Sequence, residues 1–294
     1  MNRLIIIDAS PLAYRSYYAS GTKNLKTSKG VLSGTFFGCL RSFVSLKARF
    51  PKSHFIFCFD SGDSWRNQIY KDYKTHDPVS KLKGFDEQLG DVYIFLEACG
   101  IPIFKQKGLE ADDLISICAC EWVACNEDST SIIVSSDRDF FQLVSDDISC
   151  YDDRAKIFYG PKEVEAKLGV KPEDVVKYKA LLGDKADNIA GIYGYGPKKS
   201  AHFAKHKFGY EDFLSSEQQD IFTINKELIT LPRGMYCLTG LISPPAWEKL
   251  DAKISDAFSL FNGYQLRKIN IAISTELLRK YEVKTIHISD FTED

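Results

Sequence analysis

The sequence lacks any run of apolar residues long enough to cross a bilayer. Its first apolar run ends at Asp8 after four residues, whereas a spanning helix needs about 18 or more. The eight cysteines include no CxxC pair, the spacing typical of structural zinc sites. Most of them lie inside apolar stretches such as FIFCFD, which favours buried, reduced thiols. These absences predict a soluble, intracellular protein from a reducing compartment, with no membrane partner.

The sequence also lacks a strong net charge, because 38 Lys and Arg residues face 40 Asp and Glu residues. The charge is unevenly distributed, however. Residues 65–83 carry five basic and two acidic residues, and residues 194–207 carry four lysines and no acid. Such patches can bind a phosphate backbone, since salt confines their field to about 8 to 10 Å. Solvated helix faces are the alternative for either patch.

Short β-rich apolar runs alternate with helical patterns in the first 160 residues. Three runs end in aspartate, at Asp8, Asp60 and Asp137, and such apolar runs are typical of buried parallel strands. Amphipathic helices are predicted at 34–50, 85–100 and 111–124, with a short strand at IPIFK between the last two. This alternation predicts an α/β domain over residues 1–160, with a doubly wound and mainly parallel sheet.

The pattern changes to short helices after Pro161. The segments PKEVEAKLG, PEDVVKYKALLGD and PKKSAHFAKHKFG predict a helical unit at residues 161–215. Residues 216–294 include an amphipathic candidate at ELLRKY, so we expect a mainly helical region there, without a defined role.

Acidic side chains recur where the predicted strands end. Ligands of an open α/β sheet collect beyond the carboxyl ends of its strands, so Asp8, Asp60 and Asp137 are expected to converge. Asp139 follows two residues after Asp137, a spacing that returns a side chain to the same face. Both can therefore reach a common ion.

Two further acidic clusters extend this set. GLEADDL places Glu110, Asp112 and Asp113 at the start of a predicted helix, and Asp184 and Asp187 lie three residues apart in LLGDKADNIAG. Acids in a first helical turn are ordinary on their own, but the mutual repulsion of the whole set requires cations to offset it. Oxygen ligands without histidine or cysteine suit magnesium or manganese. Two such ions can activate a water and stabilise the leaving oxygen in phosphodiester cleavage.

Five segments in this order resemble the 5′-nuclease family of flap endonucleases and 5′→3′ exonucleases. They are IIIDASPLAYRSYYA, FCFDSGDSWRNQIYKDYK, GLEADDL, SSDRDFFQLVSD and LLGDKADNIAGIYGYGPKKSA. The resemblance implies a PIN-like fold and a structure-specific nuclease that uses two Mg²⁺ ions, with Mn²⁺ as a substitute. It places the metal ligands at Asp8, Asp60, Glu110, Asp112, Asp113, Asp137, Asp139, Asp184 and Asp187.

The segment GIYGYGPKKSA resembles the helix-hairpin-helix element of the same family. The resemblance implies that Gly191, Gly194 and Gly196 let backbone amides approach a DNA phosphate, and that a potassium ion binds there. Lys198 and Lys199 follow directly and favour contact with a duplex. Lys179 matches another basic, DNA-binding position of the family. Taken alone, GIYGYG favours a glycine-rich turn between helices.

Residues 65–90 resemble the arch through which that family handles single-stranded 5′ ends. The resemblance implies that Tyr73 stacks on a base and that Lys74 meets the scissile phosphate, with Arg15 offsetting charge in the transition state. It also implies DNA contacts at Arg66, Lys81 and Lys83.

The resemblance implies DNA with 5′ ends, flaps, nicks or gaps as the substrate, with RNA–DNA hybrids as a further candidate. A monomer in the cytoplasm of a bacterial or phage-infected cell is expected, acting in replication, repair or recombination. Two alternatives use the same residues. One is a ribonuclease of the PIN type, and the other is a DNA-binding protein whose acids no longer catalyse.

Overall fold

The computed structural model describes residues 2–19, 24–26, 30–75, 82–206, 209 and 212–233. A six-stranded sheet lies at its centre, in the order β3-β2-β1-β4-β5-β6. Its strands are β1 (Asn2–Asp8), β2 (His54–Cys58), β3 (Ile103–Phe104), β4 (Ser129–Val134), β5 (Ile148–Asp152) and β6 (Ile157–Tyr159). All neighbours are parallel except β5 and β6, which pair antiparallel. The predicted parallel sheet is confirmed, with an antiparallel strand added at one edge.

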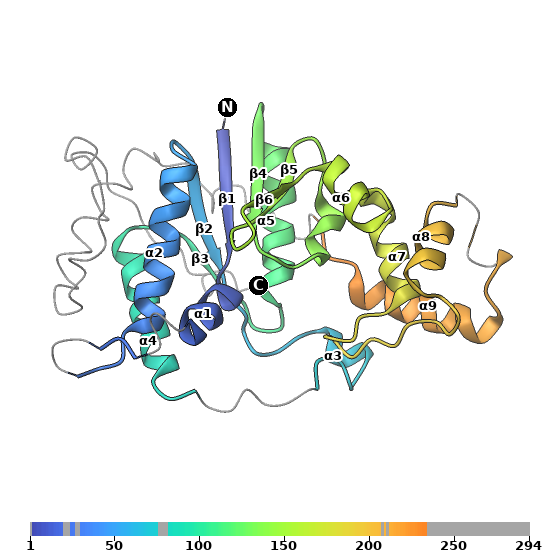
Figure 1. Ribbon diagram of the computed structural model, residues 1–294, viewed down its shortest axis with the longest axis horizontal. Coiled ribbons are helices and arrows are strands. Elements are labelled where there is room, and N and C mark those ends of the chain that lie inside the picture. The colour runs from blue at the N-terminus through green and yellow to red at the C-terminus, as the bar shows by residue number, and fades with distance from the viewer. Residues whose placement is uncertain are drawn as a thin grey trace, which may run out of the picture.

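Helices cover both faces of this sheet (Figure 1). One face carries α1 (Ala9–Tyr18), α2 (Gly34–Arg49) and α4 (Phe85–Ala98), and the other carries α5 (Ala111–Cys125). Within β1, Ile5 and Ile7 pack into the core formed with α1, α2 and α4. Leu4 and Ile6 pack into a second core, formed with α5 on the other face. Side chains alternate across a strand, so a strand buried on both faces is apolar throughout. This explains the uninterrupted run before Asp8.

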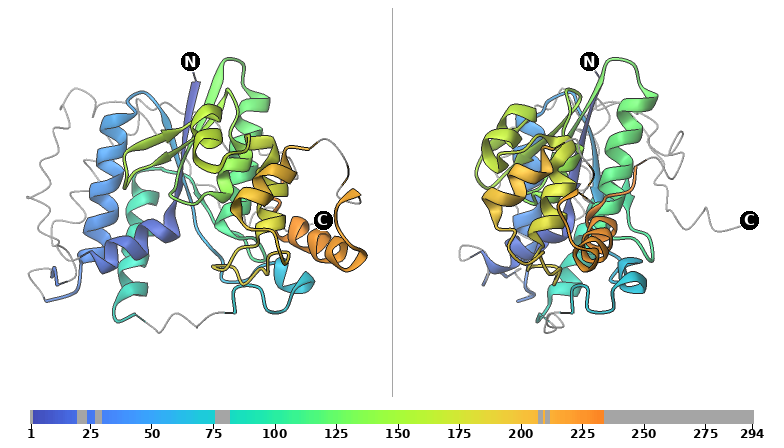
Figure 2. Two further views of the ribbon diagram at one scale, coloured as in Figure 1. Left: turned by 45° about the vertical axis from the view of Figure 1, so that its right-hand side comes forward. Right: turned by 90° about the vertical axis from the view of Figure 1, so that its right-hand side faces the viewer.

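A helical unit follows the sheet and comes forward in the turned views of Figure 2. It comprises α6 (Pro161–Leu168), the 3-10 turn η2 (Pro172–Asp174), α7 (Val175–Leu182), α8 (Pro197–Ala204) and α9 (Ser216–Ile229). Proline opens α6 and α8, as its fixed φ favours at a first helical position. The three helices predicted between residues 161 and 207 are present.

The helical unit shares its packing with the sheet. Val164, Val170 and Val175 lie in the same buried cluster as β1 and α5 residues. A third cluster joins α7, α9 and the glycine-rich loop to Tyr73 from the base of the predicted arch. The segments on either side of residue 160 are therefore packed together. No helix in the described ranges is long and apolar enough to cross a membrane. ELLRKY and the rest of residues 234–294 lie outside those ranges.

Candidate active site

Three acidic side chains lie where parallel strands end. Asp8 is the last residue of β1, Asp60 comes two residues after β2, and Asp137 comes three residues after β4. The charges of Asp60 and Asp137 both act on Asp8. The convergence predicted from the strand ends is therefore present in the structure.

Asp8 is buried and only half satisfied. Its Oδ2 accepts a hydrogen bond of 2.7 Å from the Ser135 hydroxyl. Its Oδ1 has no partner among the described residues. Burial raises the pKa of Asp8 to about 7, the Ser135 hydrogen bond opposes that rise, and repulsion from Asp60 and Asp137 adds to it. A buried carboxylate oxygen without a partner is costly unless a cation or proton meets it.

Asp112 adds a fourth acid to this group from the first turn of α5. Burial is the main cause that raises its pKa well above the usual range, and repulsion from Asp8 and Asp137 contributes. Asp60 holds the start of the same helix, because its Oδ1 accepts a hydrogen bond of 2.9 Å from the Ala111 amide. The acids of β1, β2, β4 and α5 thus form one group.

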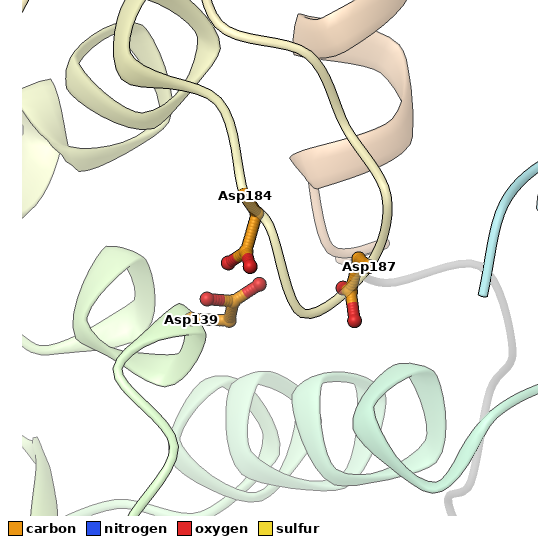
Figure 3. A group of neighbouring side chains, drawn as sticks. All are labelled: Asp139, Asp184 and Asp187. Atoms are coloured by element: carbon orange, nitrogen blue, oxygen red, sulfur yellow. The ribbon is translucent and has the colours of Figure 1, made fainter. Parts of the chain in front are cut away.

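A second acidic group adjoins the first. Asp139, Asp184 and Asp187 place carboxylate oxygens within 4.8 Å of one another. Figure 3 shows the carboxylates of Asp139 and Asp184 facing each other, with Asp187 on the same loop as Asp184. Burial raises the pKa of Asp187, and the Lys74 charge opposes that rise. Repulsion from Asp184 and then from Asp137 adds to it. Asp137 therefore links the two groups.

Lys179 lies inside this second group. Its ammonium pairs with Asp139 and, at 2.8 Å, with Asp184. Although burial alone raises the pKa of Asp184, the Lys179 charge brings it below the usual range. Lys179 was predicted to contact DNA; in this structure its side chain is 11% exposed and is engaged by these carboxylates.

Glu110 is held by four side chains. Its oxygens accept hydrogen bonds from the Ser64 hydroxyl at 3.0 Å and the Tyr73 hydroxyl at 3.1 Å, and pair with Arg66 at 2.7 Å and Lys74 at 2.5 Å. Burial alone raises the pKa of Glu110, but the Lys74 and Arg66 charges lower it overall. Glu110 is therefore a fixed carboxylate at the base of the arch segment.

Asp113 is held by protein donors on both of its oxygens. Arg66 donates to both of its oxygens, at 2.7 and 3.0 Å, and the Trp65 ring nitrogen donates at 3.1 Å. The Glu110 amide donates to the same carboxylate. Asp113 is fully buried. Protein donors occupy both of its oxygens, so the metal ligation that the family resemblance implied for Asp113 is corrected.

Arg66 is equally enclosed. It is 2% exposed, and its Nε donates to the Leu228 carbonyl at 2.7 Å. The predicted DNA contact of Arg66 is corrected, because the guanidinium is used inside the protein. It joins Glu110 and Asp113 to the end of α9.

Tyr73 and Lys74 sit at the foot of the predicted arch. Tyr73 is 4% exposed and packs in the third core, so its predicted stacking on a DNA base is corrected. Lys74 adopts a φ of 51°, and its Nζ lies 3.9 Å from Asp187 as well as beside Glu110. Burial alone lowers the pKa of Lys74, but Glu110 and Asp187 raise it above the usual range. Its side chain stays 40% exposed, and it faces both acidic groups.

The glycine-rich segment has two distinct parts. A Cβ on Gly191 would lie 2.1 Å from the Leu182 carbonyl oxygen, and one on Gly183 would lie 2.3 Å from the Gly191 nitrogen. These glycines bring the two ends of the acid-bearing loop, residues 183–191, together. Gly194 has a φ of 83° in the turn closed by the Tyr195 amide and the Ile192 carbonyl, a conformation that favours glycine.

The predicted DNA-contact surface lies beyond this loop. Gly196 precedes α8, and Lys198 and Lys199 are exposed in its first turn. The Lys199 ammonium lies 3.9 Å from the centre of the Tyr195 ring. Lys83 is exposed before α4, and Lys81 lies outside the described residues.

Arg15 lies at a cavity beside the first acidic group. The cavity, of about 300 Å³, is lined by Asp8, Arg15, Ser135 and Arg154 among others. Arg15 pairs with Asp153 at 3.3 Å. Asp8 lines the same cavity, and the ion pair with Asp153 had no signal in the sequence.

Sequence reasoning missed the polar side chains that hold the acids, including Ser64, Ser135 and Gln142. The Gln142 amide group donates to the Asp139 carbonyl at 3.0 Å. The SSD and SW segments did contain Ser135 and Ser64 next to the acids and Arg66. Serine is common in turns for local reasons, so this signal was weak.

Comparison with known proteins agrees with this geometry. The family described as 5′-3′ exonuclease, N-terminal resolvase-like domain, matches residues 3–169. A 5′-3′ exonuclease of Aquifex aeolicus is 32% identical over 217 residues, covering 74% of this chain and 73% of that protein. Flap endonuclease Xni of Pseudoalteromonas translucida is 27% identical, covering 78% and 92%. DNA polymerase I of Mycobacterium leprae is 34% identical, and the match covers 67% of this chain but 22% of the polymerase.

Solved structures show the same fold. Bacteriophage T5 flap endonuclease, in a pseudo-enzyme-product complex with DNA and metal ions, has a TM-score of 0.63 and 21% identity. That alignment covers 89% of this chain and all of the other, at 100%. The PIN-like fold class implied by the sequence motifs is confirmed. With the matched domain and the converging strand-end acids, this chain belongs to the 5′-3′ exonuclease family.

Proposed function

We propose that this protein is a structure-specific 5′-nuclease that hydrolyses DNA phosphodiesters at 5′ ends, flaps, nicks and gaps. The observation that supports this most directly is the pair of adjoining acidic groups at the strand ends, joined through Asp137. RNA–DNA hybrids are included as a candidate substrate, and the protein is proposed to act as a monomer. The relatives named exonuclease and flap endonuclease support the DNA substrate.

The acids fit two Mg²⁺ ions, which Mn²⁺ can replace. The unpartnered buried Oδ1 of Asp8 needs a cation, and the all-oxygen donor set suits these ions. We assign Asp8, Asp60, Glu110, Asp112 and Asp137 to one ion and Asp139, Asp184 and Asp187 to the other. When bound, such ions polarise the scissile phosphate and lower the pKa of an attacking water. Asp113 instead receives a positioning role through Arg66.

Lys74 is proposed to act on the scissile phosphate. Its ammonium lies beside Glu110 and near Asp187, and part of its side chain is exposed. A fixed cation aimed at developing charge can contribute about 3 to 4 kcal/mol to transition-state stabilisation. Arg15, at the cavity beside Asp8, is proposed to contact a neighbouring phosphate.

The segment from α7 to α8 is proposed to bind the duplex. Exposed Lys198 and Lys199 lie where the glycine-rich turn enters α8, and turn amides at Gly194 and Gly196 can approach a phosphate or hold a potassium ion. Residues 1–160 would then supply the nuclease body and residues 161–215 the duplex contact, with 65–90, including Lys81 and Lys83, as the arch. Seven described cysteines are free, which supports a reducing cytoplasm.

Lys198→Ala is expected to reduce the salt dependence of duplex binding. Each phosphate contact contributes about 0.9 to the slope of log affinity against log salt concentration, so the slope should fall by about one unit. Fluorescence anisotropy with a nicked duplex in calcium, across a series of salt concentrations, measures it. Lys162→Ala, which removes an exposed lysine from α6, is the matched control. An unchanged slope for Lys198→Ala would show that Lys198 makes no contact with a DNA phosphate.

Metal affinity is expected to fall about tenfold between pH 8 and pH 6. Burial raises the pKa of Asp8 from 3.8 to about 7, so the folded protein binds more protons than the unfolded chain between these values. Stability without metal therefore falls as pH rises through that window and levels off above it. Metal requires the carboxylate form, so protons compete with it at pH 6. Calorimetric titration with Mg²⁺ at both pH values tests this, and equal affinities would contradict it.

Cleavage assays distinguish the proposed function from the two alternatives. Purified protein with Mg²⁺ is offered a 5′-labelled flap, a nicked duplex and an RNA hairpin. Cleavage of the flap and the nicked duplex, with the RNA hairpin intact, is expected. Preferential cutting of the hairpin would indicate a PIN-type ribonuclease. Tight flap binding without any cutting would indicate a catalytically silent DNA-binding protein.

A further inference from the structure

Helix α9 and the residues directly after it are hydrogen-bonded around three of the segments that carry candidate metal-binding acids: those of Glu110, of Asp139, and of Asp184 with Asp187. The Leu228 carbonyl accepts a hydrogen bond of 2.7 Å from Arg66, which holds Glu110 and Asp113. The Ile229 carbonyl accepts one of 3.0 Å from Gln142, whose amide also donates to the backbone of Asp139. The Leu231 amide donates back to Gln142 at 3.0 Å. Two of the three acid-bearing segments are thus fixed to the end of α9.

Asn225 makes the third connection, to the acid-bearing loop at residues 183–191. Its side-chain nitrogen donates to the Ala180 carbonyl at 2.9 Å and to the Ala190 carbonyl at 2.8 Å. These carbonyls lie on either side of Asp184 and Asp187. Asn225 is 4% exposed, so one buried amide group ties both flanks of the loop to the helix.

Asp184 and Asp187 on the loop repel each other, and Lys179 offsets only part of this charge through its pairs with Asp139 and Asp184. Asp139 and Asp184 have carboxylate oxygens within 4.8 Å of each other and of Asp187. Like charges this close disfavour their own arrangement. Buried hydrogen bonds to backbone carbonyls are strong where water is excluded, and losing the donor leaves those carbonyls unsatisfied. The geometry of the second acidic group therefore depends on the flanks that Asn225 holds.

We propose that Asn225 is a positioning residue for the metal ion held by Asp139, Asp184 and Asp187. It touches no reacting atom and acts through the backbone of the loop. α9 lies outside residues 3–169, the part matched by the family model, as Asp184 and Asp187 do. The inference rests on the proposed two-metal function.

Direct metal binding by the full chain tests this role without turnover. Mn²⁺ titrations followed by electron paramagnetic resonance compare the wild type with Asn225→Ala in the absence of DNA. Removing a residue that orients metal ligands typically costs about 10- to 100-fold in affinity. We expect one of the two Mn²⁺ sites to weaken about tenfold and the other to keep its affinity. A higher Mn²⁺ concentration should restore kcat on a flap substrate.

Two controls separate positioning from general destabilisation. Ile224→Ala changes the exposed neighbour on α9 and should leave both Mn²⁺ affinities unchanged. Near-ultraviolet circular dichroism shows whether Asn225→Ala folds. If it does not, the Mn²⁺ affinities of Asn225→Ser, which keeps a hydroxyl donor, are measured instead, and one of the two is again expected to fall. A lower melting temperature with both Mn²⁺ affinities intact would overturn the inference. A wild type that binds no Mn²⁺ would overturn the proposed function itself, and the role of Asn225 with it.

Discussion

Asp137→Asn is expected to abolish DNA cleavage and to leave DNA binding in calcium intact. Asp137 lies in the first acidic group and next to the second, because its charge acts on both Asp8 and Asp187. Its Oδ1 accepts a hydrogen bond of 2.8 Å from the Asp139 amide, and asparagine keeps that acceptor. The substitution therefore removes a metal-binding charge with little change in shape. Metal assistance contributes several kcal/mol, and each 1.4 kcal/mol is about tenfold in rate, so a loss of at least about 1,000-fold is expected.

Single-turnover cleavage of a 5′-flap in Mg²⁺ measures the first effect, and anisotropy in Ca²⁺ measures the second. Asp146→Asn is the matched control, because Asp146 is exposed and belongs to neither acidic group. It should cleave like the wild type. Equal losses of cleavage and affinity in Asp137→Asn would contradict the metal-binding assignment.

Arg66→Ala should destabilise the fold by about 3 to 5 kcal/mol, the usual cost of breaking a buried ion pair on one side. The guanidinium, 2% exposed, pairs at 2.7 Å with both Glu110 and Asp113 and donates at 2.7 Å to Leu228. Its removal leaves a fully buried Asp113 without its main counterion. Arg66→Lys keeps the charge but cannot reproduce the forked geometry, so an intermediate loss is expected.

Urea denaturation measures these stabilities. Arg154→Ala removes an exposed arginine and is the matched control, with little expected change. The double substitution Arg66→Met with Asp113→Leu should recover much of the loss, because apolar residues can replace a buried ion pair. A loss below about 1 kcal/mol for Arg66→Ala, the range of exposed ion pairs, would contradict the enclosed position of this side chain.

The parallel sheet and its acidic edge were predictable because both depend on local patterns. Apolar runs that end at Asp8, Asp60 and Asp137 indicate strands, and parallel strands bring their carboxyl ends to one edge. The remaining acids followed from the family resemblance of their motifs. Strands β5 and β6 were not predicted, since polar residues interrupt β5 (ISCYD) and β6 (IFY) is only three residues long.

The partners of the basic residues were not predictable. Arg66 stands among basic residues in the sequence, yet its acidic partner Asp113 lies 47 positions away. Lys179 resembled a DNA contact until folding placed it against Asp139. A basic residue looks the same in a sequence whether it faces solvent or a buried carboxylate, because long-range pairing leaves no periodic signal.

The sequence contains a local signal for the start of helix α9 that was not used in predicting it. Ser215 and Gln218 form a capping box, a recognisable start of a helix. What the sequence could not indicate is that Asn225 reaches Ala180 and Ala190, 45 and 35 positions away. A local pattern indicates the helix, whereas its connection to the acids depends on residues far away in the sequence.

The ammonium groups of Lys74 and Lys179 give the chain internal counterions. Each pairs with carboxylates of a candidate metal-binding group, at Glu110 for Lys74 and at Asp139 and Asp184 for Lys179. These two ammonium groups therefore offset part of the acidic charge without any divalent cation. Loading then becomes an exchange of one cation for another, which a doubly charged ion wins over sodium or potassium. Divalent metal binding would consequently have to displace the ammonium groups of Lys74 and Lys179 from these carboxylates.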